Sequence, residues 1–157
     1  MTMRGTSEIS THPLPEASDD TTPFSEICLN GARTGKLVEG AFLEAAFTCN
    51  DVFLIFLTDG IPHEETLRIY LLDRAANILD WARLGAMYST GHLSGLQPIQ
   101  PDTVRFRFFG DTDWVLTVLP AQVFAWPVLF DPPGVKRPFG FTRRFHLTGK
   151  PRPEARE

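Results

Sequence analysis

The turn-forming residues of this chain come at short intervals, and this spacing is the strongest constraint on its fold. Clusters of Asn, Asp, Gly and Pro separate hydrophobic runs of about six or seven residues. The clusters are Asn50-Asp51, Asp59 to Pro62, Asp73 to Asn77, Gln100 to Asp102 and Gly110 to Thr112. Runs of this length between turns are typical of strands that follow one another in an antiparallel sheet. The chain is therefore predicted to be mainly β, an antiparallel meander that forms a small barrel or sandwich.

Residue alternation inside the runs supports this prediction. The predicted strands cover residues 41–48, 52–58, 66–72, 78–84, 104–109 and 114–119. In the fifth of these, Val104, Phe106 and Phe108 would face one side of the sheet, and Arg105 and Arg107 the other. The run 52–57 is apolar at every position, which predicts a central strand that is buried on both faces.

Residues 63–85 allow a second interpretation, a helix. Pro62, Glu64 and Glu65 suit the first turn of a helix, because acidic side chains are favourable near its positive end. A helix would, however, place Ile69 on its polar side and Arg68 on its apolar side. We favour a hairpin with a turn at residues 74–77, in which Asn77 takes a left-handed conformation. The helix remains the alternative.

The chain is long enough for one domain, which we place at residues 24–149. Residues 1–23 are rich in Ser, Thr, Pro and acidic side chains, and residues 150–157 are similar. Both segments are predicted to be disordered tails, because they carry too little apolar surface to offset the entropy of ordering. We expect a cytoplasmic protein with no membrane contact, since no run approaches the ~20 apolar residues of a membrane helix and only two cysteines, Cys28 and Cys49, are present.

Beyond Leu119, prolines interrupt an aromatic-rich stretch. They are Pro120, Pro127, Pro132, Pro133 and Pro138, among six Phe and Trp residues. Because proline cannot donate to a β-ladder, long central strands are not expected here. We predict a segment that wraps around the sheet and buries its aromatic side chains, with an edge strand at residues 141–147.

No pattern in the sequence matches a known catalytic or cofactor site. Gly31 to Leu37 resembles a phosphate-binding loop but is one residue too short and has Leu37 where Mg²⁺ requires a hydroxyl. Ser89 and His92 lie near each other in a polar stretch, with no third residue to orient them. His63 and its acidic neighbours lack the spacing of metal ligands. We therefore expect no cofactor and favour a non-catalytic protein.

The charge distribution is uneven. Residues 132–153 contain six basic side chains and no acidic one, whereas the rest of the chain has nine basic and 19 acidic side chains, a net charge of −10. Four of the basic residues, Lys136, Arg137, Arg143 and Arg144, form a candidate interaction surface. Their spacing among Phe residues suits single-stranded nucleic acid, but the acidic remainder argues against such a partner. We favour an intramolecular clasp anchored chiefly by the aromatic side chains, Phe141 included.

Two classes of function remain. The first is a protein-interaction or accessory module, for example an immunity-type protein that neutralises a basic toxin. The second is a small β-barrel that binds an apolar small molecule in its interior. A filled core with an exposed patch would favour the module, and a deep aromatic pocket would favour the barrel. We expect the module.

Overall fold

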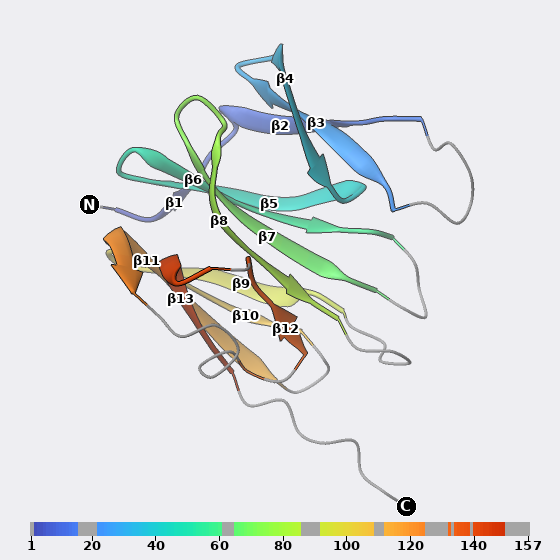
Figure 1. Cartoon of the computed structure of the whole chain (residues 1–157). Helices are drawn as coiled ribbons and strands as arrows, with labels where there is room; N and C mark the ends of the chain where they lie inside the picture. Colours follow the sequence, from blue (N-terminus) through green and yellow to red (C-terminus); the bar gives the residue numbers. More distant parts are fainter. Residues whose placement is uncertain are drawn as a thin grey trace, which may run out of the picture.

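The protein is an assembly of β-strands (Figure 1). The computed structural model describes residues 2–15, 22–60, 65–85, 92–108, 112–124, 132, 134–138 and 140–149. Within these residues every regular element is a strand, and no helix is long and apolar enough to cross a membrane. The strands are β1 (Arg4–Gly5), β2 (Ile9–Pro13), β3 (Phe24–Leu29), β4 (Ala32–Glu39), β5 (Phe42–Cys49), β6 (Val52–Thr58), β7 (Leu67–Asp73), β8 (Ile78–Leu84), β9 (Ser94–Ile99), β10 (Thr103–Arg107), β11 (Asp113–Phe124), β12 (Val135–Lys136) and β13 (Thr142–Gly149).

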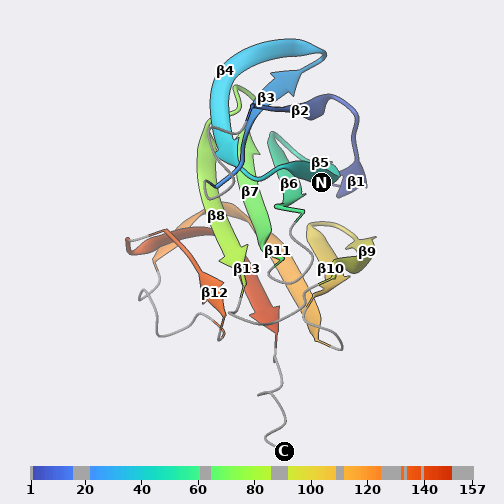
Figure 2. The same cartoon turned by 90° about the vertical axis from the view of Figure 1, so that its right-hand side faces the viewer.

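The strands form three antiparallel sheets in layers (Figures 1 and 2). A six-stranded sheet with the order β1-β5-β6-β7-β8-β12 lies in the middle. A four-stranded sheet, β13-β11-β10-β9, packs on one of its faces, and a three-stranded sheet, β2-β3-β4, packs on the other. All three sheets are open at both edges within the described residues, so these strands form a layered sandwich and no closed barrel.

The middle strands of the central sheet, β6 and β7, are buried on both faces because they carry apolar side chains on both. All seven residues of β6 are buried, as the uninterrupted apolar run predicts. In β7, Leu67, Ile69 and Leu71 contribute to the core shared with the four-stranded sheet, whereas Tyr70 and Leu72 contribute to the core shared with the three-stranded sheet. The predicted alternation in the four-stranded sheet is also confirmed, because Val104, Phe106 and Phe108 are all buried.

Residues 67–84 form a hairpin, so the helix considered for residues 63–85 is wrong over this range. The Asp73 carboxylate accepts hydrogen bonds from the backbone N–H groups of Ala75 and Asn77 at 2.9 Å and fixes the turn. The left-handed residue is Ala76, with φ of 66°, and not Asn77 as predicted. Asn77 instead donates its side-chain amide to Asp73.

The amino-terminal segment contradicts the predicted disordered tail over residues 3–13. Met3 and Ile9 are buried, one in each core, and β2 pairs with β3 along its whole length. Two buried side chains together with a row of backbone hydrogen bonds are enough to order the segment, although it has few aliphatic residues. The other predicted tail, residues 150–157, lies outside the described residues.

β11 continues past Pro120 to Phe124, although the prolines predicted that no long central strand would form there. Beyond Thr117 it pairs only with β13, and the register between these two strands shifts between Val118 and Val123. Pro120 lies within this irregular stretch, where its missing N–H is tolerated. The predicted edge strand is confirmed, since β13 is the outer strand of this sheet.

Candidate binding groove and the C-terminal basic segment

Arg137 crosses from the basic segment to the central sheet and is buried there with Asp80 of β8. The Arg137 Nη2 atom lies 2.6 Å from Asp80 Oδ2, and the two side chains are 4% and 2% exposed. Arg137 also donates to the backbone oxygens of Trp81 and Phe145 at 3.0 Å, and its guanidinium lies over the Phe145 ring. The predicted intramolecular clasp therefore has a buried ion pair at its centre.

Asp80 gathers several donors from β13. Its Oδ2 atom accepts hydrogen bonds from the backbone N–H groups of Arg144 at 2.7 Å and Phe145 at 3.2 Å, in addition to Arg137. Its Oδ1 atom accepts from the Trp81 N–H. Because one carboxylate bonds to β8, β13 and the segment after β12, it holds the central sheet and the four-stranded sheet together.

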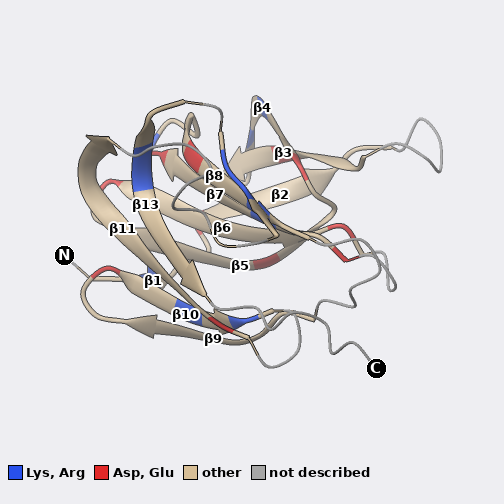
Figure 3. Cartoon of the chain, turned by 60° about the horizontal axis from the view of Figure 1, so that its bottom comes forward, with Lys and Arg blue, Asp and Glu red and all other residues tan. Residues whose placement is uncertain are grey.

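The four residues of the candidate interaction surface do not share an exposed face. Arg137 and Arg143 are buried, Arg144 is half-buried and donates to the Leu119 carbonyl, and Lys136 is exposed on β12. Figure 3 shows basic residues as a blue band on β13, but the guanidinium groups of both Arg143 and Arg144 bond within the chain. The segment does not present these four charges to a partner as one surface.

The aromatic anchor expected at Phe141 is absent. Its side chain is 50% exposed and stacks on the exposed ring of Phe124, with ring centres 5.9 Å apart. Phe145, in contrast, is fully buried. The clasp is therefore held by Arg137, Asp80 and Phe145, and Phe141 contributes to an exposed aromatic pair.

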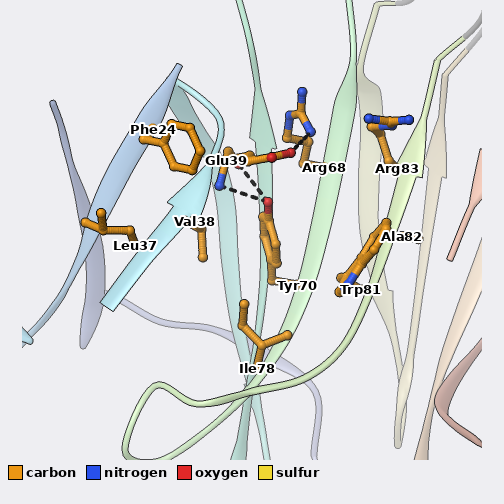
Figure 4. Close-up of a pocket in the computed structure, with 10 residues that line it drawn as sticks. All are labelled: Phe24, Leu37, Val38, Glu39, Arg68, Tyr70, Ile78, Trp81, Ala82 and Arg83. Atoms are coloured by element: carbon orange, nitrogen blue, oxygen red, sulfur yellow. Dashed lines mark hydrogen bonds and ion pairs between the residues drawn. The ribbon is translucent and has the colours of Figure 1, made fainter. Parts of the chain in front are cut away.

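An open groove lies between the three-stranded sheet and the exposed end of β8 (Figure 4). Its volume is about 340 Å³, within the range of natural ligand sites. β3 and β4 line one side, β7 forms the floor, and β8 lines the other side. The lining residues are Phe24, Leu37, Val38, Glu39, Arg68, Tyr70, Ile78, Trp81, Ala82 and Arg83.

The two ends of the groove differ in chemistry. Figure 4 shows Arg68, Glu39 and Arg83 toward one end and Ile78 at the other. Leu37 and Ile78 are large apolar side chains that stay about half exposed, although most residues of their type in this protein are buried. The groove therefore combines an apolar surface with a charged end.

Arg68 is the centre of the charged end. Its Nε and Nη2 atoms bond to the two carboxylate oxygens of Asp59 at 2.9 and 3.0 Å, and its Nη1 lies 2.6 Å from Glu39 Oε2. Burial by itself lowers the pKa of Arg68, but the hydrogen bond and charge of Asp59, with the charge of Glu39, outweigh it, and the pKa is raised. Arg68 therefore stays charged and is fully engaged within the protein.

Tyr70 fixes the position of β4 above the groove floor. Its hydroxyl donates to the Glu39 carbonyl at 2.9 Å and accepts from the Glu39 N–H at 3.0 Å. Burial raises the pKa of Tyr70 to about 12, although the charge of Arg68 acts in the opposite direction. The tyrosine is thus neutral at physiological pH and acts as a strut between β7 and β4.

Arg83 has a different environment from Arg68. It lies on β8, is half-buried and lines the groove beside Trp81 and Ala82. Within the part of the chain that the structure describes, its guanidinium has no hydrogen bond and no ion pair. It is the cation that the groove can offer to a ligand.

The other residues that the sequence singled out do not form a site. Gly31 to Leu37 runs from the turn after β3 into β4, and His92 is exposed. Ser89 and His63 lie outside the described residues. Among the described residues, no three His, Cys, Asp or Glu side chains come together as metal ligands.

No protein-family model matches this chain, and comparisons with curated proteins and with solved structures likewise gave no significant match.

The groove was not predicted from the sequence, but two signals in the sequence pointed toward it. Arg68 interrupts an otherwise apolar strand, and the hairpin alternation places it on the same face as Tyr70. Asn30-Gly31 is a strong turn signal for the β3–β4 hairpin, and both residues have positive φ.

Proposed function

We propose that this chain is a non-catalytic protein-interaction module and that the groove between β4 and β8 is its binding site. The observation that carries the proposal is the groove itself, whose lining combines half-exposed Leu37 and Ile78 with Arg83, an arginine that has no partner among the described residues. Exposed apolar side chains beside a charged group are typical of the centre and rim of protein interfaces.

Two further observations support a module over a barrel that holds a small molecule. The faces between the sheets are filled by two apolar cores, so the interior is occupied by the protein's own side chains. The groove is also open to solvent and not an enclosed cavity, which suits a polypeptide better than a buried apolar ligand. Cys28 and Cys49 are free and buried thiols, which suit a reducing compartment, and we place the interaction in the cytoplasm.

The test is affinity capture from the native host with wild-type protein, an Ile78→Glu variant and an Ile99→Glu control. Ile78 and Ile99 are 46% and 41% exposed, but Ile99 lies on β9, in another sheet. We expect a protein partner that the wild type and the control retain and that Ile78→Glu loses by about tenfold or more, as at an interface hot spot. A set of captured proteins that is the same for all three would contradict the proposal.

A further inference from the structure

Resting on the proposed function, we infer the chemistry of the partner: it is an extended peptide segment that pairs with the edge of β4 at Leu37. The segment places a carboxylate against Arg83 and a large apolar side chain over Ile78 and Trp81. The inference rests on three features of the groove, namely a strand edge and a guanidinium that have no partner among the described residues, and an apolar surface on β8.

The strand edge follows from the hydrogen-bond pattern of the three-stranded sheet. The Gly40 N–H bonds to the Pro23 carbonyl, so Gly40 and Pro23 form a hydrogen-bonded pair. Hydrogen-bonded and non-hydrogen-bonded pairs alternate along an antiparallel ladder. Glu39 and Phe24, the next pair along, therefore form a non-hydrogen-bonded pair. The Glu39 N–H and C=O accordingly point away from β3 and bond to Tyr70.

The same alternation assigns Leu37 to the open side of β4. Leu37 lies opposite Glu26, two positions from Glu39, so its backbone N–H and C=O also point away from β3. β4 is the outer strand of its sheet, and no described strand pairs with this side. An unpaired strand edge is a template for an added strand, which gives main-chain affinity for an extended peptide.

Arg83 defines the charge of the ligand. A planar guanidinium binds a carboxylate through two parallel hydrogen bonds, and partial burial strengthens such a pair relative to a fully exposed one. The neighbouring cluster of Arg68, Glu39 and Asp59 carries one positive and two negative charges. Arg83 lies beside Arg68 on β7 and Lys136 on β12, and a planar carboxylate is the anion whose shape matches its guanidinium.

The apolar surface defines the second side chain. Leu37 and Ile78 approach the groove from opposite sides, and Trp81 lies between Ile78 and Arg83 along β8. Covering Ile78 and Trp81 with an aromatic or branched aliphatic residue removes their surface from water, which favours binding. Side chains on one face of a strand recur at every second residue, so the carboxylate and the apolar side chain should have an even separation in the peptide.

The experiment is selection of random linear peptides displayed on phage against the full chain, followed by measurement of Kd by fluorescence anisotropy. We expect enriched peptides that carry Asp or Glu at an even separation from Phe, Trp, Leu or Ile. Arg83→Gln should weaken their binding by about tenfold or more, because a hydrogen bond to a charged group is lost. Arg105→Gln, on the outer face of the four-stranded sheet, is the matched control and should leave Kd unchanged.

Two changes to the peptide complete the test. Replacing the acidic residue of the peptide by its amide should raise Kd by as much as Arg83→Gln does. The two changes together should raise Kd little more than either change alone. N-methylation of the backbone amide opposite Leu37 should abolish binding, whereas methylation of the adjacent amide should not. The inference fails if the enriched peptides lack an acid or bind Arg83→Gln as well as wild type.

The outcomes also separate this inference from the proposed function. Peptides that lose binding in Ile78→Glu but keep it in Arg83→Gln would refute the carboxylate and leave the groove as a protein-binding site. A different result would refute both the peptide ligand and the interaction module. In that result no peptide is enriched, and dodecanoate binds instead. Its binding would change the tryptophan fluorescence of the wild type but not that of Ile78→Glu.

Discussion

The hydroxyl of Tyr70 connects the central sheet to β4, beside the ion pair of Arg68 with Glu39. It bonds to both backbone groups of Glu39, and its ring belongs to the core between the two sheets. The groove depends on this contact, because β4 forms one of its sides. The same burial that positions the ring raises the pKa of Tyr70 to about 12, so its ionisation is coupled to folding.

This coupling predicts a loss of stability at high pH. The pKa of Tyr70 is higher in the folded state than the ordinary value of about 10. The unfolded chain therefore releases the proton first, and the contribution of Tyr70 is complete below about pH 10 and is lost as pH rises toward 12. Urea unfolding at intervals across this range should show a fall in the free energy of unfolding, on the order of 2 kcal/mol from this group.

Tyr70→Phe is the control for this prediction. It removes the titrating hydroxyl and should lower stability by about 0.5–1.5 kcal/mol at neutral pH, because the bonds to Glu39 are lost. Effects of high pH that do not involve this hydroxyl act equally on both proteins. If wild type and Tyr70→Phe lose stability in parallel between pH 10 and 12, the account of Tyr70 is wrong.

At the scale of elements, the contact between β8, β12 and β13 depends on an ion pair. Asp80 and Arg137 are both almost fully buried, and Asp80 also accepts from the backbone of β13. The sequence indicated that this segment folds back on the acidic body, but it assigned the main contribution to aromatic side chains. It could not identify Asp80, because a carboxylate in a strand with alternating polarity has the same pattern whether it faces solvent or an arginine.

We therefore expect Arg137→Ala to destabilise the protein much more than Phe141→Ala. Removing Arg137 leaves the Asp80 carboxylate buried without its countercharge, which should cost about 3–5 kcal/mol. Phe141 is half exposed, so its loss should cost about 1 kcal/mol or less. Denaturant unfolding of both variants gives the comparison. In the double variant Arg137→Ala with Asp80→Ala, the loss should be smaller than the sum of the single effects.

The reverse order of stability would contradict this account. A larger loss for Phe141→Ala would mean that the aromatic pair with Phe124 anchors the segment, as the sequence alone suggested. Additive effects of Arg137→Ala and Asp80→Ala would mean that the two side chains do not interact in solution.

The strands that the sequence predicts best are the most buried ones, although β3 was missed with half of its residues buried. β6 and β8 begin and end at the predicted residues, because apolar runs and turn residues both mark their limits. β4 and β9 were missed, since most of their side chains are exposed and show no apolar alternation. β2 was missed for the same reason, with Ile9 as its one buried side chain.

At the scale of the whole molecule, the three layers create the groove. The sequence predicted a central strand at residues 52–57 and thus a sheet buried on both faces. It did not show the full strand order of that sheet, because pairing between β1 and β5 or between β12 and β8 joins residues far apart in the chain. The groove lies where the short three-stranded sheet leaves the end of β8 uncovered, and Arg83 and Ile78 acquire their role only from that arrangement.

The central claim is that a partner protein lies in this groove, and site-specific photo-crosslinking in the native host tests it most directly. A photoreactive p-benzoylphenylalanine replaces Leu37 in one variant and Ile99, on β9, in a control; both positions are exposed in the free protein. We predict a discrete crosslinked adduct from position 37 that the control lacks and that the added change Ile78→Glu abolishes. No adduct from position 37, or the same adduct from both positions, would contradict the assignment of the groove as the binding site.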